Sequence, residues 1–143
     1  MSDKHVLYMI GGVPGSGKSW LANILRHHSE ANNVECLCVA ADDFMFDDKG
    51  DYKFDRSRLS ICHLWCQSSV LGAMNREVPT IVVHNTFVRQ WERDVYRELA
   101  KEFSYQIMEI DCDARFGNIH GVPEEKVDKM RVMWEFVAKG EKV

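Results

Sequence analysis

Eight residues decide the fold: Gly12-Val13-Pro14-Gly15-Ser16-Gly17-Lys18-Ser19. They fit the pattern G-x-x-x-x-G-K-[ST], follow an apolar run at 5–10 and open a segment with helical periodicity at 19–26. Between a strand and a helix, the glycines let consecutive amides turn inward and donate to phosphate oxygens, and the positive end of the helix dipole adds to the attraction. We therefore predict that this phosphate-binding loop holds ATP or GTP.

Two side chains of the loop have specific predicted tasks. Lys18 is expected to reach the β- and γ-phosphates of the nucleotide. The hydroxyl of Ser19 is expected to bind a Mg²⁺ ion that bridges oxygens of the same two phosphates. Lys18 is therefore a predicted catalytic residue, and Ser19 is the predicted metal ligand.

The rest of the chain alternates between strand and helix patterns. Apolar runs predict strands at 34–40, 80–83 and 105–110, and helical spacing of apolar residues predicts helices at 59–75, 91–103 and 123–137. This alternation predicts an α/β fold: a mostly parallel sheet of four to five strands with helices on both faces, which binds ligands at the strand carboxyl ends. We expect one P-loop NTPase or kinase domain over residues 1–143.

Composition limits the setting of the protein. The 143 residues are 45% hydrophobic and carry a formal net charge of -4, which is ordinary for a globular domain and argues against a basic coat for long duplexes. No apolar run is long enough to span a bilayer, and five cysteines, an odd number, suit reduced thiols in the cytoplasm. Zinc binding by the pairs Cys36 with Cys38 and Cys62 with Cys66 is the less favoured alternative to core packing.

An acidic pair follows the second predicted strand. Asp42 and Asp43 end the run at 34–40, and this strand is expected to neighbour the strand that leads into the phosphate-binding loop. One carboxylate would then face the γ-phosphate and accept a proton from an acceptor hydroxyl, which is the arrangement of a kinase. The alternative is that either residue caps the following segment, where aspartate is favoured.

Several motifs also resemble one known group of proteins. In chain order they are GGVPGSGKS, ADDF, G-x-Y-x-F-D at 50–55, His63, HNT at 84–86 and NIHGVPEEKVDKM from Asn118. The sequence resembles the P-loop kinases that include the phage 5′-polynucleotide kinase and related small polynucleotide-kinase-like ATPases. The resemblance covers nearly the whole chain, and NIHGVP is its most particular motif.

The resemblance implies roles for further residues. Asp42 would be the general base that activates the acceptor hydroxyl, and the segment 111–121 would be a lid that brings Arg115 to the transferring phosphoryl group. Relatives usually carry an acid near Mg²⁺ where this chain has His84, and an arginine where it has Gly117. His84 is expected either to hydrogen-bond a phosphate or the acceptor, or to be a satisfied histidine at a strand end.

An acceptor pocket is predicted from the segment that follows the acidic pair. Aromatic side chains would stack on a base and arginines would meet its phosphate, while the alternative is a solvated basic start of a helix. The candidate residues for acceptor binding are Asp43, Tyr52, Phe54, Arg56, Arg58, His63 and His84. Arg89, Arg93 and Arg97 alternate with acids and predict an exposed helix face without an assigned function.

The first functional hypothesis is a Mg²⁺-dependent kinase that transfers the γ-phosphoryl group of ATP to a hydroxyl. The acceptor is expected to be a nucleic-acid 5′-hydroxyl or a nucleoside-like compound, and a small-molecule kinase is the nearest alternative. The second hypothesis, from another class, is a nucleotide-binding module with weak or no transfer activity. An NTPase switch is less favoured, because the acidic pair and aromatic segment suit an acceptor site.

Overall fold

The computed structural model describes residues 4–112 of the chain. Its strands are β1 (Val6–Gly11), β2 (Cys36–Val39), β3 (Thr80–His84) and β4 (Gln106–Asp111), and its α-helices are α1 (Lys18–Ala31), α2 (Leu59–Asn75) and α3 (Gln90–Phe103). Two 3-10 turns, η1 (Ala41–Phe44) and η2 (Arg56–Arg58), lie between β2 and α2. All elements predicted within this range are therefore confirmed, and the helix predicted at 123–137 lies outside the described residues.

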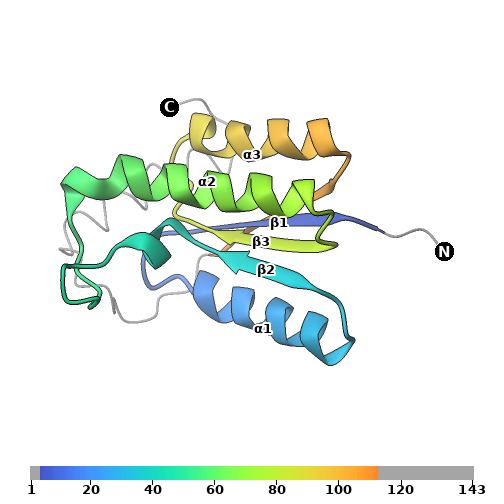
Figure 1. Ribbon diagram of the computed structural model, residues 1–143, viewed down its shortest axis with the longest axis horizontal. Helices are drawn as coiled ribbons and strands as arrows, with labels where there is room; N and C mark the ends of the chain where they lie inside the picture. Colours follow the sequence, from blue (N-terminus) through green and yellow to red (C-terminus); the bar gives the residue numbers. More distant parts are fainter. Residues whose placement is uncertain (1–3, 113–143) are drawn as a thin grey trace.

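The strands form one parallel sheet in the order β2-β3-β1-β4. Helix α1 covers one face of the sheet, and α2 and α3 cover the other (Figure 1). Parallel strands end at the same edge, so β1, β2 and β3 deliver the segments that follow them to one place. The predicted parallel α/β fold with helices on both faces is confirmed.

The prediction that β2, the strand before the acidic pair, neighbours β1 was wrong. Strand β3 pairs with both β1 and β2, so it separates the acidic pair from the loop strand by one position in the sheet. Burial explains this order, because Ile81, Val82 and Val83 of β3 are fully buried and suit a central strand covered on both faces. Most of β2 is only half-buried, which suits an edge.

The core has two layers, and β1 contributes to both. Leu7 and Met9 belong to the large cluster beneath α2 and α3, whereas Ile10 belongs to the small cluster beneath α1, as the two-residue period of a strand requires. Cys62 and Cys66 are fully buried in the large cluster, so the core-packing interpretation of this pair is confirmed. Residues 4–112 contain no cluster of three or more metal-ligating side chains and no helix that could cross a membrane.

Candidate active site

The phosphate-binding loop joins β1 to α1 and is built on left-handed glycines. Gly15 has φ of 82° and Gly17, the residue before α1, has φ of 96°. The first turn of α1, which lies wholly within the described range, carries no acidic side chain. The buried hydroxyl of Ser16 finds no hydrogen-bond partner among the described residues. A helix N-terminus without an acid, beside an unsatisfied donor, fits the phosphates of a nucleotide.

Gly12 is required at the start of this loop. Its φ is 149°, and a Cβ atom there would lie 2.2 Å from Ser16 Oγ and 2.8 Å from the carbonyl oxygen of Cys112. The Gly12 amide donates to the carbonyl of Thr86 at 3.3 Å, which ties the loop to the end of β3. An added methyl group would therefore displace the loop from the sheet.

We expect Gly12→Ala to weaken nucleotide binding by roughly tenfold or more, since strain of about 1–3 kcal/mol would fall on the loop itself. Calorimetric titration with ATP measures the dissociation constant, and thermal unfolding measures the loss of stability. Gly50→Ala is the matched control, because Gly50 also has positive φ (83°) but has open space where the Cβ atom would be. Equal ATP affinity in wild type and Gly12→Ala would contradict the assignment.

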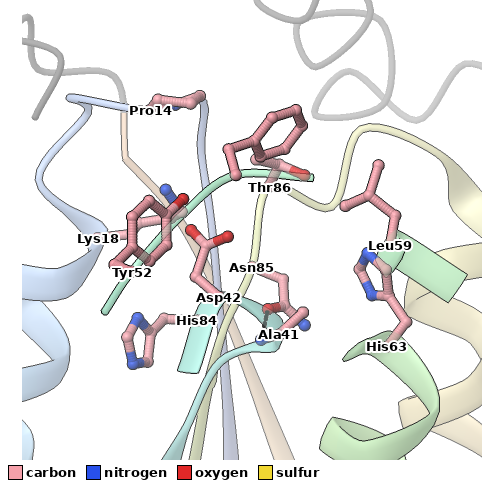
Figure 2. A pocket seen from close by; sticks show the side chains of 11 residues that line it. Pro14, Lys18, Ala41, Asp42, Tyr52, Leu59, His63, His84, Asn85 and Thr86 are labelled. Carbon is pink, nitrogen blue, oxygen red and sulfur yellow. Dashed lines mark hydrogen bonds between the residues drawn. The ribbon is translucent and has the colours of Figure 1, made fainter. Parts of the chain in front are cut away.

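Lys18 points into a pocket at the carboxyl ends of the strands (Figure 2). Its side chain is buried, and this burial lowers the pKa of its ammonium group, although the charges of Asp42 and Cys112 act in the opposite direction. A buried ammonium whose pKa is lowered is incompletely compensated by the described protein groups. Phosphate oxygens would supply that compensation. Ser19, the next residue, is exposed in the first turn of α1.

Asp42 lies at the centre of the pocket. Figure 2 shows its carboxylate between Lys18 and Tyr52 on one side and Leu59 and His63 on the other. Burial raises the pKa of Tyr52 to about 12, and the Asp42 charge adds to the shift. The same carboxylate therefore acts electrostatically on both the phosphate-binding lysine and Tyr52.

His63 faces Asp42 from the first turns of α2. Burial lowers the pKa of His63 below its ordinary value, and the Asp42 charge only partly opposes this. His63 is therefore neutral at pH 7, with one ring nitrogen able to donate a hydrogen bond and the other able to accept one. His84 lines the same pocket from the end of β3.

The lowered pKa of His63 predicts a pH dependence of stability. Between the folded-state pKa and the unfolded value of about 6.5, the unfolded chain binds a proton that the folded chain does not. The free energy of unfolding should therefore fall as the pH drops below about 6.5. We expect the fall in Tm between pH 7.5 and pH 5.5 to be smaller in His63→Gln than in wild type. Parallel curves of Tm against pH for the two proteins would contradict this prediction.

Three predicted acceptor residues are not brought into this pocket, as far as residues 4–112 define it. The carboxylate of Asp43 is exposed and accepts a hydrogen bond from the Ala40 amide at 2.8 Å, so Asp43 caps η1. Arg56 is exposed on η2. Arg58 donates to the carbonyl of Phe46 and lies 5.8 Å from the ring centroid of Trp65. These placements favour the capping alternative for Asp43 and a structural one for Arg58.

Tyr52 lines the pocket from the end of a short loop after η1, the 46–52 loop. Phe46 and Tyr52 pair as an antiparallel bridge at its base, and the Asp47 amide donates to the Asp51 carbonyl at 2.9 Å. The Asp47 carboxylate accepts from the amides of Lys49 and Asp51. Tyr52 thus reaches the pocket from a loop that is held mainly by its own hydrogen bonds.

The exposed-face prediction was wrong for Arg93. Its side chain is 5% exposed and donates to the carbonyl of Phe87 at 3.2 Å and to the carboxylate of Asp111 at 2.9 Å. The guanidinium also lies 3.5 Å from Glu109, which forms two hydrogen bonds with Arg97. The sequence signal for the burial of Arg93 was the pair of acids Glu109 and Asp111, two residues apart on β4. Residues two apart on a strand share one face, and α3 covers this face.

Asn85 is a site residue to which the sequence pattern assigned no role. It is buried at the end of β3, and its side-chain oxygen accepts a hydrogen bond from the Ala41 amide, next to Asp42. A polar residue directly after an apolar strand was its only signal. Arg115 and the predicted lid from residue 113 onward, including Gly117, lie outside the described residues.

The sheet, the loop and the lysine–aspartate pocket define a nucleotide-binding domain of the P-loop kinase type. Residues 7–120 match the AAA domain family, and the chain belongs to this family. Human NEDD4-binding protein 2 is 32% identical over 134 residues, which cover 87% of this chain and 7% of that relative. The chain thus corresponds to a small part of this larger protein.

Solved structures share the fold. A chain of the Pnkp1/Rnl/Hen1 RNA repair complex matches with a TM-score of 0.71 and 16% identity, covering 98% of this chain and 47% of its own. The Mycobacterium tuberculosis APS kinase CysC in complex with AMPPNP and APS matches with a TM-score of 0.59 and 14% identity, covering 98% and 77%. A chain of AvrRxo1-ORF1:-ORF2 with ATP matches with a TM-score of 0.68 and 20% identity, covering 96% of this chain and 49% of its own. The resemblance to P-loop kinases is therefore confirmed for family and fold.

Proposed function

We propose that this domain is an ATP-dependent phosphotransferase that moves the γ-phosphoryl group to an acceptor hydroxyl. The observation that carries the proposal is the meeting of Lys18 and Asp42 in one pocket at the strand carboxyl ends. A phosphate-binding lysine and a carboxylate beside it are the two groups that an in-line transfer between oxygens needs. Known kinases among the structures that share the fold support this reaction class.

Each residue has one task in this reaction. The amides of the loop and the Lys18 ammonium bind and orient the β- and γ-phosphates, and Ser19 would hold a Mg²⁺ ion that would supply further charge neutralisation. The acceptor oxygen bonds to the γ-phosphorus while the bond to the β–γ bridging oxygen breaks and ADP leaves. The acceptor proton passes to a carboxylate oxygen of Asp42. Arg115, outside the described residues, is proposed to contribute charge to the transition state.

The acceptor is proposed to be the 5′-hydroxyl of a short nucleic acid or a nucleoside-like compound. Tyr52 and Phe54 provide ring faces on which a base can stack, and the neutral His63 provides hydrogen-bonding groups, as does the imidazole of His84. The formal net charge of -4 disfavours long duplexes, which require many phosphate contacts. Free thiols in all five cysteines suit work in the cytoplasm.

The test is label transfer from γ-labelled ATP with Mg²⁺ to DNA and RNA oligonucleotides bearing 5′-hydroxyls, to nucleosides and to a panel of small hydroxyl compounds. We expect transfer to an oligonucleotide or nucleoside, and prior 5′-phosphorylation of the oligonucleotide should remove it. Transfer only to small compounds would keep the reaction and overturn the acceptor. ATP binding without any transfer would overturn the reaction.

A nucleotide-binding module is the second candidate, and one observation favours it. Strand β3 ends in His84 at the position where related kinases usually carry an acid near Mg²⁺, and His84 lies in the pocket beside Lys18 and Asp42. A site with fewer acids would hold the metal more weakly and turn over more slowly. Binding of ATP that changes little when Mg²⁺ is removed, with no transfer, is the signature of this candidate.

A further inference from the structure

The turn that carries Asp42 is held by a residue from a distant part of the chain. The side-chain oxygen of Asn85 accepts a hydrogen bond of 2.8 Å from the Ala41 amide, across 44 residues of sequence (Figure 2). Asn85 is 5% exposed, so water competes little for this bond. Removing the side-chain oxygen would leave a buried amide at the residue directly before Asp42.

Two further hydrogen bonds hold the turn, one within its own element and one from α2. The Asp43 carboxylate accepts from the Ala40 amide, and the thiol of Cys62 donates to the carbonyl of Phe44 at 3.4 Å. Neither contact reaches the strand that leads into the phosphate-binding loop. Asn85 thus links the turn to the central strands.

Asn85 is fixed to those strands by its backbone. Its amide donates to the carbonyl of Ile10 on β1 at 3.2 Å, one residue before β1 ends at Gly11. The next residue, Thr86, accepts from the Gly12 amide at the start of the phosphate-binding loop. The amide nitrogen of the Asn85 side chain lies 3.8 Å from the buried sulfur of Cys66. One residue therefore connects the phosphate side of the pocket to the Asp42 side.

We propose that Asn85 is a positioning residue, which sets the place of the Asp42 carboxylate relative to the phosphate-binding loop. The inference rests on the proposed function in so far as Asp42 is the general base. It assigns to Asn85 no contact with substrate. Its effect on transfer passes entirely through the Asp42 turn.

The kinetic test compares Asn85→Leu with Cys66→Ala. Asn85→Leu removes the acceptor of the Ala41 amide, and we expect kcat to fall about 10²-fold, the cost of a misplaced catalytic group, with KM for ATP unchanged. Cys66→Ala disturbs the same core but keeps the Ala41 bond, so kcat should stay within about twofold of wild type. An equal loss of kcat in both variants would overturn the proposal, because packing alone would then explain it. If Asn85→Leu does not fold, Asn85→Ala removes the same oxygen without adding bulk.

A second readout is independent of transfer activity. The charge of Asp42 raises the pKa of the facing His63, so a displaced carboxylate should lower that pKa. We expect the His63 ring resonance, followed by NMR against pH, to titrate at lower pH in Asn85→Leu, in the direction of Asp42→Asn, and unchanged in Cys66→Ala. A wild-type His63 titration in Asn85→Leu would overturn the proposal. This holds even if no acceptor is phosphorylated and the proposed function fails.

Discussion

Replacing Lys18 with alanine is expected to abolish nucleotide binding and leave the fold intact. The ammonium is the charge that the described pocket buries beside the phosphate-binding loop, and loss of one such contact costs about 10²-fold or more in transfer. Because burial disfavours the charged lysine, the nucleotide-free protein should unfold at the same or a higher temperature after the change. Calorimetry with ATP and thermal unfolding measure the two effects.

Two further variants sharpen this experiment. Lys18→Met keeps a long side chain without the charge and should match Lys18→Ala in ATP affinity, so a difference between them would report on shape. Lys101→Ala removes an exposed lysine from the last turn of α3 and should change neither measurement. Unchanged ATP affinity and unchanged hydrolysis in Lys18→Ala would refute the site.

Asp42→Asn is expected to remove transfer and preserve ATP affinity. The amide keeps the size of the carboxylate but cannot accept the acceptor proton, so kcat should fall by roughly 10²–10⁴-fold, the usual contribution of a general base. The KM for ATP should change little, since the change leaves the phosphate-binding loop and Lys18 in place. Label transfer to the best acceptor, at saturating ATP, gives the rate.

The neighbouring aspartate is the matched control. Asp43→Asn changes the same charge one residue further on, where the carboxylate caps the Ala40 amide. It should cost about 0.5–2 kcal/mol of stability, as the loss of a cap does, and leave kcat near wild type. A fully active Asp42→Asn would contradict the general-base assignment. An equal loss of rate in Asp42→Asn and Asp43→Asn would contradict it too, because a change in the shape of η1 would then explain both losses.

The sequence predicted what is encoded locally. The loop motif, its place between a strand and a helix, and the alternation of elements all follow from residues within about ten positions of one another. The same patterns predicted the parallel sheet, because alternating strands and helices have few ways to pack. These local patterns could not predict the order of the strands in the sheet, because that order depends on which strand is buried on both faces.

The contacts that complete the site could not be predicted for the same reason. Asn85 meets Ala41 across 44 residues, and no periodicity reports on a bond of that range. The burial of Arg93 depends on the packing of α3 against the acids of β4, which charge spacing along the helix does not reveal. The choice between Asp42 and Asp43 required the geometry of η1, since both residues are aspartates and either position suits a helix cap or a general base.

In the proposed reaction, the 46–52 loop would keep acceptor recognition apart from phosphoryl transfer. Lys18 and Asp42 are anchored through β1 and β3, whereas Tyr52 is presented by a segment held largely by hydrogen bonds within itself. On the proposed function, exchange of this one loop would change the acceptor preference, while Lys18 and Asp42 would keep the places that the sheet gives them. A new acceptor would then require a new loop and no change in the elements that hold Lys18 and Asp42.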